Sequence, residues 1–302
     1  MARSAAQPGQ ARRMRALLAP YALALPAVAL VGVFLYGTVN GIMQGFGIMP
    51  FLGMNEPTLD YFAMVFSRPD FTSSMAFSMR ISIVSSAIAL AGGIVLSWAL
   101  TRAKWGRFPQ LVGLQIPIMT MHALVALALV FIFSGSGLAS RALYFLGLAA
   151  SPTDLGSIVG APSGWGIVAV YAWKEIPYIA FCTVTIMAHV SDSLGEAAAT
   201  CGASGFRSFL HVTLPLCLPA ALRAFLVVFV FSLGSYEVPF LLGPTTPKAM
   251  PVLAYMEFTN PDIVNRCYAM ALNGVTALVC AVAALVYFAL ILRERKQEGM
   301  RG

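Results

Sequence analysis

Three ionisable side chains, Lys174, Glu175 and Glu237, interrupt stretches of sequence that are otherwise apolar. In apolar surroundings a charged group is costly unless it faces a cavity, a bound solute or an opposite charge. The aromatic residues Trp173 and Tyr178 lie beside the first two in the sequence, and rings of this kind can contact a cation. These residue types suit the binding of a charged group, although an ion pair between Lys174 and Glu237, or simple packing of the two rings, would also explain them.

Glu237 lies in a segment whose sequence favours an interrupted helix, because Gly234 and Pro239 flank it. Both residues can break a helix and free backbone carbonyls, and a carboxylate beside free carbonyls suits a cationic ligand. A position at the membrane surface is the alternative for Glu237. Lys174 and Glu175 are adjacent, so on a helix they point about 100° apart. We therefore expect only one of them to face inward.

The other titratable residues form no catalytic or metal-binding set. No histidine or cysteine pair has ligand spacing, and no phosphate-binding loop of the GxxxxGK[ST] type occurs. We expect no enzymatic activity, no bound metal and no nucleotide hydrolysis in this chain. A stand-alone secondary carrier would need ion-coupling groups, which the apolar stretches lack apart from the three residues above. The scattered residues are His122, His189, His211, Cys182, Cys201, Cys217, Cys267 and Cys280.

The composition places the chain in a lipid bilayer. Of its 302 residues, 59% are hydrophobic and only 10% are charged, against roughly 25% charged residues in soluble domains. Lipid permits only helices or closed barrels to cross it, and the apolar runs are too long for barrel strands. The predicted fold class is all-α, a polytopic membrane bundle.

Long gaps between charged residues predict six membrane-spanning helices, since each span needs about 20 apolar residues. The fourth gap contains Lys174 and Glu175, and the fifth contains Arg223 and Glu237, so a pair of interfacial helices is the alternative there. The expected spans are 17–43, 81–101, 108–140, 164–190, 219–242 and 267–292.

Basic residues predict the orientation of these spans. They cluster before the first span, between the second and third, and after the sixth, and cytoplasmic loops carry such an excess. Both termini are therefore expected in the cytoplasm, and the net charge of +7 reflects topology and not a nucleic-acid site. The clustered residues are Arg3, Arg12, Arg13, Arg15, Arg102, Lys104, Arg107, Arg293, Arg295, Lys296 and Arg301.

Two outer loops and the second span carry further patterns. Short amphipathic segments in 45–80 and 135–163 are expected to lie on the membrane face. Small residues in the second span permit close contact with another helix, either of this chain or of another subunit. These small residues are Ala89, Gly92, Gly93 and Ser97.

A polar segment, residues 191–217, separates the fourth and fifth spans. Asp192 or Ser193 can cap a short helix, and Glu196 in its first turn complements the helix dipole. A break at Gly202 precedes a second amphipathic run. The segment therefore predicts two short helices joined at a glycine, serving either as a partner-binding elbow or as a plain re-entry loop.

One pattern in this segment resembles the EAA loop of the inner-membrane permease subunits of binding-protein-dependent ABC importers: Glu196-Ala197-Ala198, Gly202 and Leu214-Pro215. The resemblance extends from residue 59 to the sixth helix. It implies that the elbow is a coupling helix, received by a groove in a separate cytoplasmic ATPase subunit. ATP-driven movement of the elbow would then rock the helices between inward-open and outward-open states.

The same resemblance implies the partners and the location. We expect two ATPase subunits that bind ATP and Mg²⁺, a second permease subunit, identical or homologous, and an extracytoplasmic binding protein that delivers the solute. The chain itself needs no cofactor and resides in the bacterial inner membrane. Residues 1–16 form a cytoplasmic tail, 17–292 the permease domain with the coupling loop 191–217, and 293–302 a second cytoplasmic tail.

The stretch from Phe231 to Gly243 is similar to permeases of the spermidine/putrescine type, whose relatives also carry ferric iron, thiamine or aminoethylphosphonate. This implies a small, cationic, polyamine-like solute. The acidic residue here follows Tyr236, whereas some polyamine permeases place it directly after the Ser-Leu-Gly. We expect Glu237→Gln to weaken transport of a cation while the complex still assembles. The expected solute-path residues are Glu237, Tyr236, Ser235, Lys174, Glu175, Trp173 and Tyr178.

Overall fold

The protein is a helical bundle in the computed structural model, which describes residues 10–103, 106–149, 151, 158–190, 194, 200 and 202–299. Within these residues no strand forms beyond an isolated bridge between Met49 and Met54. Six helical stretches are long and apolar enough to cross a membrane. This confirms the predicted fold class. The six stretches are Leu23–Gly45, Pro69–Arg102, His122–Phe145, Trp165–Val190, Gly205–Gly234 and Asn265–Ala289.

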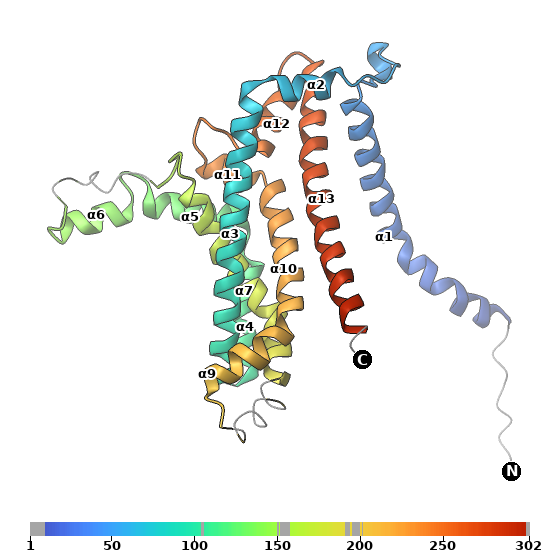
Figure 1. Cartoon of the computed structure of the whole chain (residues 1–302). Coiled ribbons are helices and arrows are strands. Elements are labelled where there is room, and N and C mark those ends of the chain that lie inside the picture. The colour runs from blue at the N-terminus through green and yellow to red at the C-terminus, as the bar shows by residue number, and fades with distance from the viewer. Residues whose placement is uncertain are drawn as a thin grey trace.

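The helices run between two ends of the bundle, which we call the α2 end and the α9 end (Figure 1). Helix α1 begins, and α13 finishes, toward the α9 end. In chain order the described elements are α1 (Gln10–Gly45), a 3₁₀ turn (Pro50–Leu52), α2 (Asp60–Ser67), α3 (Pro69–Arg102), α4 (Arg107–Met119), α5 (His122–Phe133), α6 (Leu138–Phe145), α7 (Trp165–Val190), α9 (Gly205–Ser208), a π-helical turn (Phe209–Thr213), α10 (Leu214–Gly234), α11 (Glu237–Leu242), α12 (Met250–Phe258) and α13 (Asn265–Gly299).

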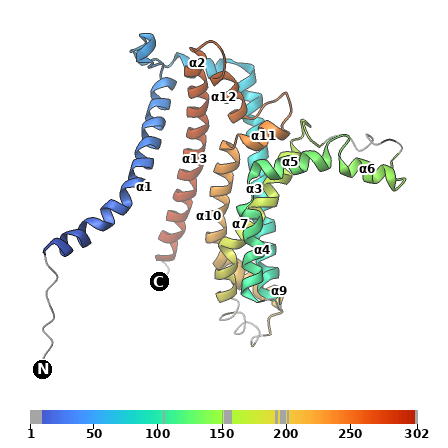
Figure 2. The same ribbon diagram turned by 180° about the vertical axis from the view of Figure 1, so that it is seen from behind.

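Helix α1 stands apart from the bundle. It lies beside α13 near the α2 end and diverges from it toward the other end, as Figures 1 and 2 both show. Gly41 and Gly45 face Met270 of α13 where the two helices meet. None of the apolar window of α1 is buried inside this chain, so its outward face is left to lipid or to another subunit.

Helices α3 and α7 form the tightest pair. A Cβ placed on Gly93 would lie 2.7 Å from the Cβ of Ile179, so only glycine allows this approach. The Ser97 hydroxyl lies 2.6 Å from that of Thr183. The small residues of the second span therefore serve a contact within the chain, which answers the question that the sequence left open.

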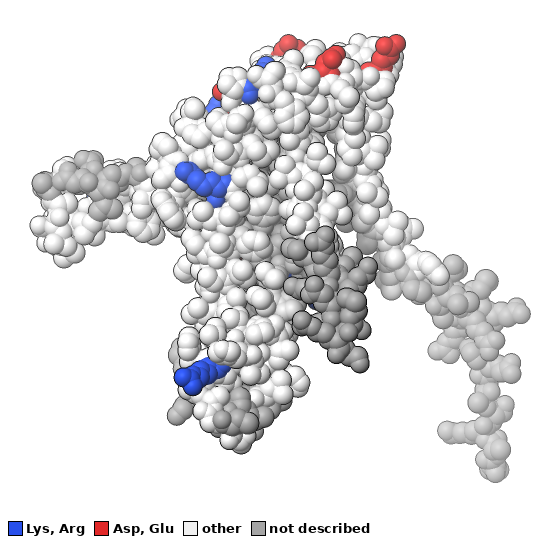
Figure 3. All heavy atoms as spheres, viewed as in Figure 1, with Lys and Arg blue, Asp and Glu red and all other residues white. Residues whose placement is uncertain are grey.

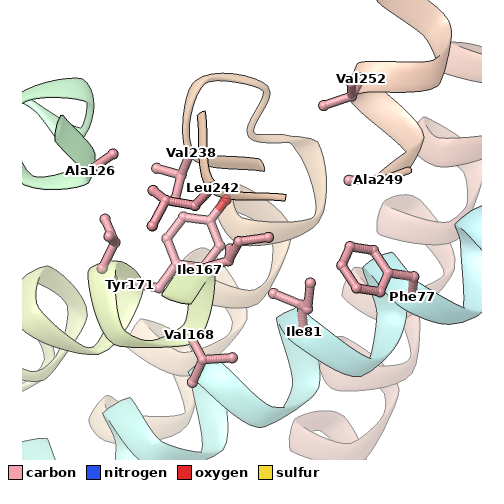
Figure 4. Packing of buried hydrophobic residues seen from close by; sticks show 11 residues of the cluster. Phe77, Ile81, Ala126, Ile167, Val168, Tyr171, Val238, Leu242, Ala249 and Val252 are labelled. Carbon is pink, nitrogen blue, oxygen red and sulfur yellow. The ribbon is translucent and has the colours of Figure 1, made fainter. Parts of the chain in front are cut away.

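A buried apolar cluster ties α7 to the helices at the α2 end. Tyr171 and Ile167 of α7 are fully buried against Val238 and Leu242 of α11, with Ile81 of α3 alongside. Figure 4 shows the Tyr171 ring beside Val238 and Leu242 of α11, with Ile81 of α3 nearby. Burial of aromatic and aliphatic side chains of this size dominates core energetics, so this cluster fixes the position of α7.

The predicted third span, 108–140, is wrong as a single helix. It divides into α4 and α5, with a break at Thr120 and Met121, and α6 follows after a turn near Gly137. Pro117 lies in the last turn of α4, where it lacks an N–H group and weakens the helix. Beyond the break, α5 and α6 project sideways from the bundle (Figures 1 and 2).

The predicted fifth span, 219–242, also has different bounds. Helix α10 starts at Leu214 and ends at Gly234, and Glu237 opens the separate helix α11. Pro219 lies inside α10 and not at its start, because the chain enters the helix directly from the π-helical turn. The expected break at Gly234 is confirmed.

Two further sequence predictions are confirmed within the described residues. The amphipathic segments of the outer loops correspond to α2 and α6, and α7 begins one residue after the predicted start of the fourth span. Figure 3 shows acidic side chains and some basic ones at the α2 end, a further basic group below them, another near α9, and mostly uncharged surface elsewhere. A mostly uncharged surface of this kind is what a bilayer requires.

Candidate functional site

A cavity of about 200 Å³ lies where α7 and α10 meet the break between α4 and α5. It contains charged side chains although its walls are mainly apolar, a combination typical of small-solute sites. The lining residues are Ile118, His122, Lys174, Glu175, Tyr178, Val227, Val228 and Phe231.

The break between α4 and α5 supplies a free backbone carbonyl to this region. Thr120 and Met121 are both extended, with ψ of 136° and 137°, so the helical hydrogen-bond ladder stops there. The Thr120 hydroxyl donates to the carbonyl of Ile116 at 2.7 Å and closes the end of α4. The carbonyl of Thr120 itself is left to a partner outside the helix.

Lys174 is that partner. Its side chain is 7% exposed, and its ammonium group donates to the Thr120 carbonyl. The same nitrogen lies 3.2 Å from Nδ1 of His122, the first residue of α5. A buried ammonium group needs such acceptors, and Lys174 therefore holds the two sides of the break together.

Glu175 is buried next to it, with 4% exposure. The Ser232 hydroxyl of α10 donates to Oε1 at 2.7 Å, whereas Oε2 has no hydrogen-bond partner among the described residues. An unpaired carboxylate oxygen in an apolar wall is costly. The cavity therefore favours a hydrogen-bond donor at this place.

The prediction that only one of Lys174 and Glu175 faces inward is wrong. Both are buried and both line the cavity. The two side chains still point about 100° apart, but α7 is enclosed by α3, α4, α5 and α10, so the cavity spans both directions. Crowding of helices around α7 is a tertiary property that the local sequence does not reveal.

His122 and Phe231 belong to the site, and sequence analysis gave neither a role there. Their rings lie 4.8 Å apart, and Tyr171 approaches His122 at 6.4 Å. In the sequence His122 is one of several scattered histidines and cysteines and lies inside the predicted span 108–140. The signal that could have found it is Pro117 five residues earlier in an uncharged stretch, which weakens the helix just where a polar ring follows.

The other expected solute-path residues lie at different depths. Tyr178 lines the cavity, whereas Trp173 is 57% exposed and turned away from it. Glu237 is exposed in the first turn of α11, and no ion pair joins it to Lys174. Ser235 and Tyr236 form the link between α10 and α11.

Tyr236 belongs to an aromatic group beside Glu237. Its ring lies 4.7 Å from Tyr255 and 5.0 Å from Phe240. Burial raises the pKa of the Tyr236 phenol, and the neighbouring Tyr255 adds to this shift. The phenol therefore stays protonated at neutral pH and keeps a hydrogen-bond donor at the α2 end of the molecule.

Only part of the expected elbow is described. Glu196, Ala197 and Ala198 lie outside the described residues. Gly202 has a φ of +80°, a left-handed conformation that favours glycine. Leu214 and Pro215 form the first turn of α10, with Leu214 half-buried against Met187 and Phe209.

Residues 90–301 match the model of the family described as binding-protein-dependent transport system inner membrane component. The chain is 25% identical to the sn-glycerol-3-phosphate transport system permease protein UgpA of Brucella abortus biovar 1 (strain 9-941), over 92% of this chain and 95% of that relative. It is 24% identical to the sulfate transport system permease protein CysT of Salmonella typhimurium (strain LT2), over 75% of this chain and 77% of that protein.

A solved structure shares the fold. A chain of a bacterial ABC transporter involved in the import of the acidic polysaccharide alginate superposes with a TM-score of 0.71 at 20% identity, covering 93% of this chain and 96% of that one. A second structure of a bacterial alginate ABC transporter, in complex with a periplasmic protein bound to an alginate pentasaccharide, gives 0.67 at 20% identity.

Proposed function

The chain belongs to the family of binding-protein-dependent transport system inner membrane components, the permease subunits of ABC importers, and on that premise we propose that a small polar solute passes the cavity beside Lys174 and Glu175. The observation that carries the proposal is the burial of two charged side chains in the middle of a candidate span, both lining one cavity. Ionisable residues at such depth mark solute pathways because burial without a function is costly.

The solute that fits this cavity carries both an anionic group and a hydrogen-bond donor. Lys174 and His122 present nitrogen atoms on one side, and the unpaired oxygen of Glu175 accepts on the other. The names of the relatives mention glycerol 3-phosphate, sulfate and alginate, all of them anions. Aminoethylphosphonate, one of the alternatives from the sequence, combines a phosphonate with an ammonium group and would engage both sides at once.

A cationic, polyamine-like solute is the second candidate. The unpaired oxygen of Glu175 favours it, since that oxygen would accept from an ammonium group. Against it, Glu237 lies outside the cavity, and Lys174 would repel a second positive charge at this place.

The energy for transport would enter through the elbow 191–217. We infer that Glu196, Ala197, Ala198 and Gly202 dock in a groove of one of two cytoplasmic ATPase subunits, which bind ATP and Mg²⁺. The positive φ of Gly202 and the short helix α9 that follows support a bent elbow at the α9 end. Both termini then lie in the cytoplasm, because α1 begins and α13 finishes toward the same end (Figure 1).

Two further partners complete the proposed importer. A second permease subunit, identical or homologous, would close the other side of the path, and the unburied face of α1 is available to it. An extracytoplasmic binding protein would deliver the solute to the opposite, α2 end, where α2 and α12 form the surface and acidic side chains gather (Figure 3).

The test starts from the binding protein that co-purifies with the permease. Its affinity is measured for aminoethylphosphonate, glycerol 3-phosphate, sulfate, spermidine, thiamine and ferric iron, and the bound compound is then used for ATP-driven uptake into proteoliposomes. We expect a compound with a phosphonate or phosphate group to bind, and Glu175→Gln to lower its uptake while the complex assembles. Uptake that needs an ion gradient and no ATPase would instead assign the chain to stand-alone secondary carriers.

A further inference from the structure

A group of aromatic side chains at the α9 end surrounds the point where the elbow joins the bundle. We call it the Trp98 cluster; it comprises the aromatic residues Trp98, Phe206 and Phe209 and the adjoining Arg102 and Met187. Trp98 and Arg102 belong to the last two turns of α3, and Met187 to the last turn of α7. Phe206 belongs to α9, and Phe209 opens the π-helical turn.

The rings of the cluster contact one another directly. The Trp98 ring lies 5.0 Å from Phe209 and 6.1 Å from Phe206, measured between ring centroids. Separations of this size give favourable aromatic pairs. Phe209 is 9% exposed, and it packs with Met187 and Cys217, so the cluster joins α3, α7 and the start of α10 in one unit.

The Arg102 side chain covers one face of the Trp98 ring. Its guanidinium carbon lies 4.5 Å from the centre of the Trp98 ring, within cation–π range. The same guanidinium group lies over the backbone of Gly205, the first residue of α9, where a Cβ would collide with it. The end of α3 therefore contacts α9 at two places, Arg102 at Gly205 and Trp98 at Phe206.

The cluster joins the elbow 191–217 to the bundle, with Met187 just before the elbow and Phe206 and Phe209 in its second half. We propose that Trp98 is the positioning residue that transmits displacement of the elbow to α3. This rests on the proposed function, in which the segment 191–217 receives the ATPase. Movement of the elbow must displace Phe206 or Phe209, and both rings lie on Trp98.

The experiment measures alternating access without a known solute. In a cysteine-free background, Ile118→Cys places a reporter thiol in the cavity wall, and maleimide labelling is compared with and without ATP and vanadate in the full complex. We expect Trp98→Ala to retain ATPase binding and hydrolysis but to lose about tenfold of the ATP-dependent change in labelling rate, because two ring pairs and a cation–π contact disappear. Trp98→Phe should restore most of that change.

Two other variants keep the test decisive. Phe206 is 58% exposed, so Phe206→Ala endangers folding less and should give a smaller loss in the same direction. Trp165→Ala removes an exposed indole at the opposite end of α7 and should leave labelling unchanged.

Three results would overturn the proposal or its premise. Wild-type labelling changes in Trp98→Ala would reject a transmitting role for Trp98. Loss of ATPase binding in Trp98→Ala would reject it in favour of a docking surface. If the wild-type chain itself recruits no ATPase, the proposed function fails, and this outcome is separate from the other two.

Discussion

The cavity and the Trp98 cluster share helix α7, on which Glu175 and Met187 lie about three turns apart, and they differ in what they leave open. In the cavity, Oε2 of Glu175 has no hydrogen-bond partner among the residues that the structure describes, and Lys174 donates to a carbonyl freed by a helix break. In the Trp98 cluster, rings and a guanidinium group cover one another. The first arrangement can exchange partners, whereas the second resists deformation.

This difference matches the two tasks that we propose for these regions. A solute must bind and leave, so its site needs hydrogen-bond capacity that the protein itself does not use. A mechanical link must keep its geometry under load, so it needs close-packed contacts. The contact between α3 and α7 connects the two regions, since Gly93 allows these helices to pack closely and the Ser97 hydroxyl donates to the carbonyl of Ala180.

The largest effect is expected where both regions lose their common support. Gly93→Leu forces a side chain into Ile179 and the backbone carbonyl of Ile176, and overpacking of this kind costs about 1–3 kcal/mol or more. We expect a clear drop in the thermal stability of the detergent-solubilised protein and loss of both cavity and cluster functions. Gly32→Leu is the matched control, because nothing lies within 4 Å of that position. Equal stability of the two variants would contradict tight α3–α7 packing.

The next effect should separate the cavity from the cluster. Lys174→Met leaves the Thr120 carbonyl without its donor, and lost hydrogen bonds to charged groups cost about 1.5–3 kcal/mol. We expect uptake of the solute selected by the binding protein to fall about a hundredfold, while ATPase binding persists. Lys248→Met, which alters a lysine outside the cavity, should transport normally. Full uptake by Lys174→Met would remove the cavity from the path.

A smaller effect is expected on ATPase binding by the elbow alone. Gly202 has a φ of +80° and open space around it, so Gly202→Ala adds backbone strain of about 1–2 kcal/mol without a clash. We expect the affinity for the ATPase to fall several-fold and the labelling of the cavity without ATP to stay unchanged. Gly147→Ala introduces the same strain at a φ of +70° far from the elbow, so it serves as the control. An equal loss of ATPase affinity in both variants would contradict a specific elbow.

The smallest effect is expected at the boundary of the cavity. Glu237 is exposed and lies outside the cavity wall, so Glu237→Gln should change the KM for uptake by less than about twofold, as exposed charges contribute little. Glu175→Gln, measured beside it, should have the larger effect. A strong loss in Glu237→Gln would extend the solute path to α11 and would favour the cationic solute.

Charge and hydropathy predicted most of the fold, because charged residues inside a bilayer cost free energy and long uncharged stretches therefore indicate spans. One of the two helix breaks escaped prediction. Residues 108–140 carry no charge, so the gaps between charges do not mark the interruption at Thr120, which depends on Pro117 and on a lysine from another helix. In the fifth span, Gly234 correctly predicted the end of α10.

The candidate site was predicted in part. Lys174, Glu175 and Tyr178 were found because their types are unusual or placed beside charges, and all three line the cavity. His122 and Phe231 were missed, because a histidine or a phenylalanine acquires a role only when neighbouring helices bring it to a charge. The close packing of Trp98 with Phe206 and Phe209 spans more than 100 residues of sequence, and no local pattern indicates it.

The π-helical turn Phe209–Thr213 lies within one continuous helical stretch, Gly205–Gly234. It sets the angle around the helix axis between the side chains before the turn and those after it. A π turn holds one residue more than an α turn, and each residue rotates a helix by about 100°. Removing a single residue from this turn would therefore swing Phe206 away from Trp98 while Phe231 kept its place in the cavity wall. The length of this turn therefore sets the angle around the helix axis between Phe206 at the Trp98 cluster and Phe231 in the cavity wall.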